Sequence, residues 1–110
     1  MNFIPAQAVQ DGVFEALGLR LPGPRGHQNL TLGVRAEDLT PADEGLQCSV
    51  AVIEPLGAQT LVTALPGHGV LRAALPSAAS VAVGQSLRLK PEADRVRWFD
   101  AQGRCVNMEA

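Results

Sequence analysis

Apolar and polar residues alternate along most of this chain, in short runs that end at glycine or proline. In residues 30–34, Leu30, Leu32 and Val34 share one side of an extended chain while Thr31 faces the other side. A period of two is typical of a half-buried strand. The same pattern predicts further strands at residues 3–9, 13–17, 19–21, 46–54, 59–65, 70–75, 86–90, 95–99 and 104–106.

The alternation also assigns faces within these strands. It predicts a common face in each of two sets, Leu46 with Cys48, Val50 and Val52, and Thr60 with Val62 and Ala64. Pro5 favours an edge strand or a strand start for residues 3–9, because proline has no N–H to donate to a ladder.

Turn residues separate the predicted strands. Asp11-Gly12 is a strong hairpin signal, and Pro/Gly-rich or acidic loops are expected at residues 22–29, 41–45 and 66–69. At most one helical turn is expected, at residues 77–80, and no stretch has the period of an amphipathic helix. The predicted fold class is therefore all-β, a small barrel or sandwich of short antiparallel strands.

The strand at residues 30–34 runs into a short charged corner. Residues 36–39 are too few for a helix and Pro41 prevents continuation, so one tight turn is expected there, carrying Glu37 and Asp38. Side chains of adjacent residues on a turn diverge, so this pair is interpreted as solvated turn charges rather than an acid/base pair. Arg35 can pair with Glu37 or with a carboxylate on a partner protein.

Composition limits the possible partners. The 110 residues have a net charge of -2 and 46% hydrophobic residues, which suits one domain over residues 1–110 with a single core. Lys90 is the sole lysine and aromatics make up 4%, so a nucleic-acid partner is not expected. No apolar run has the length of a membrane span and no signal peptide is recognisable, so a cytoplasmic location is expected.

The sequence gives little sign of catalytic chemistry. It has no phosphate-binding loop of the Gly-x-x-x-x-Gly-Lys-(Ser/Thr) type and no Gly-x-Ser-x-Gly elbow. Cys48 and Cys105 lie far apart and are interpreted as reduced core or strand residues. His27 and His68 lie in glycine-flanked loops, where a solvated histidine is more common than a metal ligand. We therefore expect no catalytic residue, no cofactor and no metal in this chain.

Four motifs, taken in order, carry a resemblance to a known family. Residues 33–39, Gly-Val-Arg-Ala-Glu-Asp-Leu, resemble the Gly-(Ile/Val)-Arg-Pro-Glu-(His/Asp)-Leu signature of the TOBE domain on ATP-binding subunits of ABC importers. Residues 1–6 resemble the segment that leads out of the ATPase domain in the sugar and glycerol-phosphate importer branch. Residues 54–62, Glu-Pro-Leu-Gly-Ala-Gln-Thr-Leu-Val, resemble a motif of that branch, and residues 96–104 resemble its closing hairpin. Ala36, Asp38 and Trp98 depart from the usual family residues.

The resemblance implies both a fold and a role. It narrows the fold to an OB-like barrel, and it implies an ATPase domain before residue 1 that binds ATP and Mg and performs the hydrolysis. This chain would then be a non-catalytic regulatory and dimer-contact domain of an importer for carbohydrates or glycerol 3-phosphate. The implied partners are its own ATPase domain, a second copy in a homodimer, permease subunits at the inner face of the membrane and a cytosolic regulator.

Two further questions stay open at the level of sequence. Alternation turns one of Trp98 and Phe99 inward, and the other, if exposed, would be an interface anchor, as would Phe3 in an apolar first strand. The alternative function is a β-barrel module that binds a small ligand, an oxyanion or a solute. The Ser/Thr-Ala-Arg-Asn opening of molybdate-binding relatives is absent, which argues against that alternative.

Overall fold

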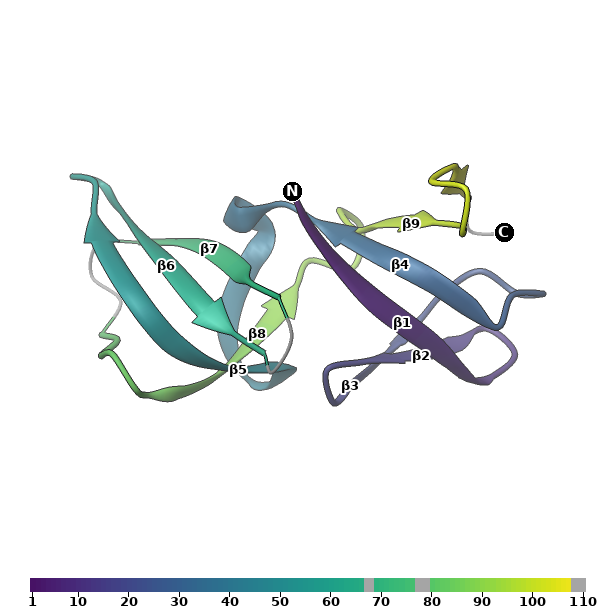
Figure 1. The fold of residues 1–110 in the computed structure, drawn as a ribbon, viewed down its shortest axis with the longest axis horizontal. Coiled ribbons are helices and arrows are strands. Elements are labelled where there is room, and N and C mark those ends of the chain that lie inside the picture. The colour runs from purple at the N-terminus through teal and green to yellow at the C-terminus, as the bar shows by residue number, and fades with distance from the viewer. Residues whose placement is uncertain (67–68, 77–79, 108–110) are drawn as a thin grey trace.

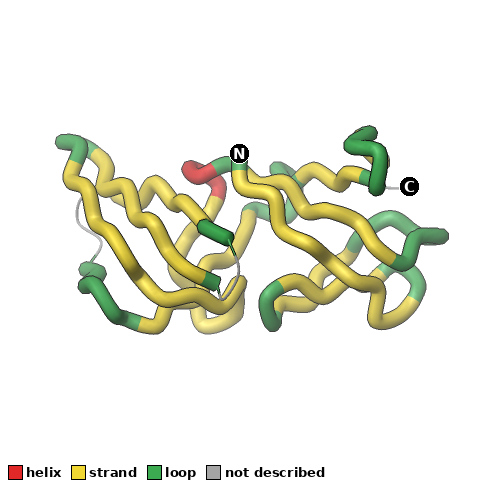
Figure 2. Tube along the Cα trace, in the orientation of Figure 1, coloured by secondary structure: helices red, strands yellow, loops and turns green. Residues whose placement is uncertain are grey.

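The computed structural model describes residues 1–66, 69–76 and 80–107, and it is built almost entirely of antiparallel strands (Figure 1). The strands are β1 (Asn2–Gln10), β2 (Val13–Ala16), β3 (Leu19–Pro22), β4 (Asn29–Val34), β5 (Leu39–Pro55), β6 (Gln59–Leu65), β7 (Leu71–Pro76), β8 (Ser86–Pro91), β9 (Arg97–Phe99) and β10 (Cys105–Val106). One 3₁₀ turn, η1 (Ala36–Asp38), lies between β4 and β5 and is the red segment in Figure 2.

The strands form two curled sheets that lie side by side along the long axis of the molecule (Figure 1). The first has the order β10-β9-β4-β1-β2-β3 and the second the order β7-β6-β5-β8. The chain measures 41 × 24 × 23 Å along its principal axes. The predicted all-β class and the small OB-like barrel of curled antiparallel strands are confirmed.

Both sheets contribute to one apolar core. The residues that the period of two places on one face of a strand are mostly the buried ones, including Leu30, Leu32 and Val34 on β4. On β6 the residues predicted to share a face, Thr60, Val62 and Ala64, are all buried. The largest fully buried side chain is Phe14 of β2. Simple alternation therefore explains most of the core without any helix.

Two predictions from alternation and proline are wrong in instructive ways. Val52 is 47% exposed, because an extra residue between Val50 and Val52 shifts the β5–β6 register and reverses the faces beyond it. Strand β1 is also not an edge strand, since it pairs with both β4 and β2. The N-terminal half of β1, which contains Pro5, pairs only with β4, where Pro5 lies opposite Thr31. Pairing of β1 with β2 begins at Gln7, so no strand on that side needs an N–H from Pro5.

The side chain of Asn2 ties the first sheet to the outer edge of the second. Its amide nitrogen donates to the carbonyl oxygen of Arg72 at 2.8 Å, and its amide oxygen accepts from the Arg72 N–H at 2.8 Å. Asn2 is 8% exposed. At this position of β7, the Asn2 side chain thus takes the place of the two backbone hydrogen bonds that a neighbouring strand would make.

Replacing Asn2 with alanine should lower the free energy of unfolding by about 1–3 kcal/mol, because it leaves both partly buried backbone groups of Arg72 without their partner. Urea unfolding followed by circular dichroism would measure the change. Asn29→Ala, at an exposed site on β4, is the matched control and should change stability by less than about 0.5 kcal/mol. Equal effects for the two variants would show that the Asn2 bridge contributes nothing.

A second irregularity lies near the start of β5. Both Pro41 and Leu46 align with Leu89 of β8, so the residues between them loop out of the ladder; we call residues 42–45 the β5 bulge. The predicted acidic loop at 41–45 therefore exists, within a longer strand. The helical turn expected at 77–80 and the histidine at position 68 fall on or overlap residues outside the described ranges.

Candidate protein-interaction site

The corner after β4 divides its two carboxylates between solvent and interior. Asp38 is 7% exposed and forms an ion pair with Arg95, in which Asp38 Oδ1 lies 3.9 Å from Arg95 Nη1. Glu37, in contrast, is exposed. Side chains in a 3₁₀ turn point about 120° apart, so neighbouring residues face different surroundings. The interpretation of both as solvated turn charges is therefore wrong for Asp38, while their predicted divergence is confirmed.

The corner does not contain the ion pair expected between Arg35 and Glu37. In the described part of the chain the ion pairs are Arg20 with Glu15 and Arg95 with Asp38. Arg35 is exposed at the extended residue that precedes η1, with φ -78° and ψ 151°. The guanidinium of Arg35 and the carboxylate of Glu37 therefore lie on the surface, where a partner protein could reach them.

Trp98 and Phe99 lie on opposite faces of β9, as alternation requires. Trp98 is 2% exposed, and its ring centroid lies 4.9 Å from that of Phe14 in the core. Its buried Nε1–H has no hydrogen-bond acceptor among the described residues. Because Trp98 does not reach the surface, Phe99 is the residue of this pair that stays a candidate interface anchor.

Phe99 takes part in an apolar cluster on the outer face of the first sheet. Its ring centroid lies 5.7 Å from that of Phe3, edge to face, and Phe3 is 63% exposed. Between β1 and β9 lies Gly33, where an added Cβ would meet Phe99 Cε2 at 2.6 Å and Met1 Sδ at 2.9 Å. We call Met1, Phe3, Gly33 and Phe99 the Phe3 cluster. The glycine leaves the space that both larger side chains use.

A groove of about 480 Å³ continues from the Phe3 cluster across the junction of the two sheets. Its walls come from β1, η1, β6 and β7, and Val70 on its rim is 51% exposed. The lining residues are Met1, Asn2, Phe3, Ala36, Leu61, Val70 and Arg72. We call this the junction groove.

The Phe3 cluster and the junction groove together form the candidate site. They unite Phe3, Phe99 and the corner residue Ala36, which are distant in sequence, on one surface. Sequence reasoning missed Leu61, Val70 and Arg72, because their position depends on how the second sheet meets the first. A surface of exposed apolar side chains with one arginine suits contact with another protein, since monomers seldom leave such patches open.

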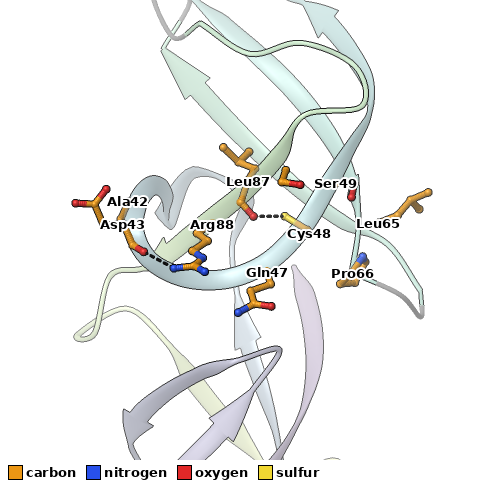
Figure 3. A pocket seen from close by; sticks show the side chains of 10 residues that line it. Ala42, Asp43, Gln47, Cys48, Ser49, Leu65, Pro66, Leu87 and Arg88 are labelled. Carbon is orange, nitrogen blue, oxygen red and sulfur yellow. Dashed lines mark hydrogen bonds between the residues drawn. The ribbon is translucent and has the colours of Figure 1, made fainter.

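A different hollow, of about 700 Å³, lies on the solvent face of the second sheet (Figure 3). Its walls come from the β5 bulge, β5, β8 and the end of β6. Arg88 donates from Nη1 to the carbonyl oxygen of Asp43 at 2.9 Å. We call this hollow the bulge pocket. Sequence reasoning did not single out any of its residues for binding.

Burial makes the Cys48 thiol poorly suited to nucleophilic chemistry. Cys48 donates to the carbonyl oxygen of Leu87 at 3.5 Å, and burial raises the pKa of its thiol, which keeps it protonated. Cys105 is exposed on β10, so the two cysteines are a core and a strand residue, as predicted, and both are free. His27 is half-buried in its loop. In residues 1–66, 69–76 and 80–107, no three potential metal ligands gather in one place.

Helices capable of crossing a membrane were not found in the part of the chain that the structure describes.

Comparison with known proteins adds a family and several relatives. The model of the TOBE domain family matches residues 32–99. The sn-glycerol-3-phosphate import ATP-binding protein UgpC of Ruegeria pomeroyi is 33% identical over 93% of this chain and 30% of its own length. The sulfoquinovosyl glycerol transport ATP-binding protein SmoE of Agrobacterium fabrum is 35% identical, over 92% of this chain and 32% of its own length.

A third relative has a less specific name. The ABC transporter ATP-binding protein y4oS of Sinorhizobium fredii is 32% identical over 91% of this chain and 29% of its own length. The chain thus spans about a third, or slightly less, of the length of each curated relative it matches.

Proposed function

Because the chain belongs to the TOBE domain family, we propose that it is the non-catalytic regulatory and dimer-contact domain of an ATP-binding subunit of an ABC importer. The observation that carries this proposal is the exposed apolar surface of the Phe3 cluster and the junction groove. The predicted fold and the four motifs of the sequence agree with it. The chemistry of transport then belongs to other parts of the transporter.

The proposal assigns the surroundings of the domain. An ATPase domain precedes it in the same subunit, binds ATP and Mg and hydrolyses the ATP. Permease subunits hold the subunit at the inner, cytoplasmic face of the membrane. The relatives support this arrangement because each is named as an ATP-binding protein and each is about three times as long as this chain.

The proposal also assigns a solute class. Two relatives are named for the import of sn-glycerol 3-phosphate and for the transport of sulfoquinovosyl glycerol. Both solutes combine hydroxyl groups with a phosphate or sulfonate group. A carbohydrate or glycerol phosphate of this anionic kind is therefore the proposed cargo of the transporter.

We propose that the Phe3 cluster binds a second copy of the domain. Phe3 is 63% exposed and Met1 54%, and burial of apolar surface is the main favourable term in association. In the transporter, pairing of the ATPase domains would hold two copies close together, so a weak contact suffices because of the raised effective concentration. Arg35 and Glu37, exposed at the nearby corner, supply charged groups to this contact or to a cytosolic regulator.

The isolated chain should therefore form a homodimer at high protein concentration, and Phe3→Ser should weaken it by about tenfold or more, as loss of a buried aromatic anchor does. Sedimentation equilibrium from micromolar to millimolar protein would measure the dissociation constant. Leu56→Ser is the matched control, because Leu56 is 61% exposed but lies at the β5–β6 turn.

Two results would count against this contact. A single monomer species at millimolar protein would remove self-association altogether. A dimer that Phe3→Ser and Leu56→Ser weaken equally would place the contact elsewhere on the domain.

The second candidate function is the binding of a small ligand, and the bulge pocket is the observation that favours it. This hollow lies on the solvent face of the second sheet. It is formed by the irregular part of β5 together with β8 and the end of β6.

A further inference from the structure

The β5 bulge folds against β8 instead of extending into solvent. Gly45 lies so close to β8 that an added Cβ would meet the backbone of Leu89 at 2.6–2.7 Å. The four residues that loop out therefore form a fixed rim beside the sheet. Bulges often occur beside functional sites, where they redirect side chains or backbone groups.

The rim holds the guanidinium group of Arg88 in place. The Asp43 carbonyl oxygen accepts from Nη1 of Arg88 at 2.9 Å, which uses one of the five N–H groups of the guanidinium. Figure 3 shows the carboxylate of Asp43 pointing away from that guanidinium. Arg88 is exposed, so its other N–H groups are open to a ligand from solvent. An arginine fork matches the oxygens of a phosphate or carboxylate.

Polar side chains from two paired strands surround Arg88. Gln47 of β5 aligns with Arg88 of β8, and Ser49 aligns with Ser86, so the four residues occupy neighbouring rows of one face. Directly opposite residues in an antiparallel pair have Cβ atoms about 4.5–5.5 Å apart. Leu65 of β6, which aligns with Ser49 of β5, forms a further wall of the pocket. The site thus offers a cation, an amide and two hydroxyl groups within the span of a small molecule.

The hollow has room for such a ligand. Its volume of about 700 Å³ lies within the range of about 300–1,000 Å³ that is usual for small-molecule sites. A smaller hollow of about 270 Å³ shares Gln47 and Arg88 with it and adds Arg20. Because serine and glutamine side chains both donate and accept, they can bind the hydroxyl groups of a ligand as well as its anionic oxygens.

We propose that the bulge pocket binds a small hydroxylated oxyanion, with the anionic group on Arg88 and the hydroxyl groups on Gln47, Ser49 and Ser86. The site is inferred from its own chemistry. The choice of glycerol 3-phosphate as the probe rests on the proposed function. Occupancy by such a molecule would let the domain report the concentration of imported solute.

Isothermal titration calorimetry of the whole chain with sn-glycerol 3-phosphate, inorganic phosphate and glycerol would test the site. We expect saturable binding of glycerol 3-phosphate, at least tenfold weaker binding of phosphate, and no binding of glycerol. Arg88→Gln should weaken the binding of glycerol 3-phosphate at least tenfold, and Ser49→Ala should weaken it severalfold. Amide resonances of Gln47, Ser49 and Ser86 should shift on titration.

Arg104→Gln is the matched control, because Arg104 is exposed in the β9–β10 turn, away from the second sheet. Thermal melting would show that each variant is folded. Absence of binding by both anions at 10 mM, or equal affinities in the Arg88→Gln and Arg104→Gln variants, would overturn the proposal. Phosphate that binds as tightly as glycerol 3-phosphate would overturn the role of the hydroxyl contacts. The sedimentation result for Phe3→Ser is independent, so failure of this site is distinguishable from failure of the proposed function.

Discussion

Phe14→Ala is expected to lower the free energy of unfolding by about 3–5 kcal/mol. The Phe14 ring is fully buried and packs against Trp98 at 4.9 Å between ring centroids. It also fills the space beside Gly23, where an added Cβ would meet Phe14 Cδ2 at 2.5 Å. Since a domain of this size is stable by roughly 5–15 kcal/mol, the variant should lose a large share of its stability.

Chemical unfolding followed by fluorescence would measure this loss, because Trp98 is the sole tryptophan and lies against the deleted ring. Phe3→Ala is the matched control, as it removes the same side chain from an exposed position of the first sheet. Phe3→Ala should lower the free energy of unfolding by less than about 1 kcal/mol in dilute solution. If both variants lost the same stability, the assignment of Phe14 to the core would be refuted.

Gly45→Ala is expected to destabilise the fold by about 1–3 kcal/mol or more. The new methyl group would lie 2.6 Å from the carbonyl carbon of Leu89 and 2.7 Å from its nitrogen and oxygen. These atoms belong to the β5–β8 ladder and cannot rotate away as a side chain can. Relief requires the β5 bulge to move off β8, which would also displace the Asp43 carbonyl from Arg88.

Thermal and urea unfolding of Gly45→Ala would test this expectation. Glu44→Ala is the appropriate comparison, because Glu44 is an exposed neighbour in the same bulge and already carries a Cβ. Glu44→Ala should change the free energy of unfolding by less than about 0.5 kcal/mol. A Gly45→Ala protein as stable as Glu44→Ala would mean that the bulge is not held against β8.

Local pattern was sufficient to predict the strands and most of the core. The period of two selected Leu30, Leu32 and Val34 correctly because each strand buries one face, and Asp11-Gly12 marked a hairpin whose glycine has a φ of 82°. The prediction failed at Val52 because one inserted residue in β5 reverses the faces. A bulge of that kind has no composition that distinguishes it from a regular strand.

The candidate site was predictable only in part, for a similar reason. Phe3 and the pair of Trp98 and Phe99 were identified because an exposed aromatic side chain can anchor an interface, but alternation left open which residue of the pair faces outward. Leu61, Val70 and Arg72 could not be found, since they meet Phe3 only through the contact between the two sheets. The ion pair of Asp38 with Arg95 likewise joins residues far apart in the chain, whereas the sequence suggested the nearer pair of Arg35 and Glu37.

The bridge from Asn2 to Arg72 also bears on aggregation. Strand β7 is an edge of the second sheet, and an open edge is a template for the addition of a strand from another molecule. An incoming strand would need the N–H and the carbonyl of Arg72, and the Asn2 amide already occupies both. A single side chain from the other sheet thus blocks one position of the edge against fibril-like growth, and Pro76 at the end of β7 has no N–H to offer an incoming strand.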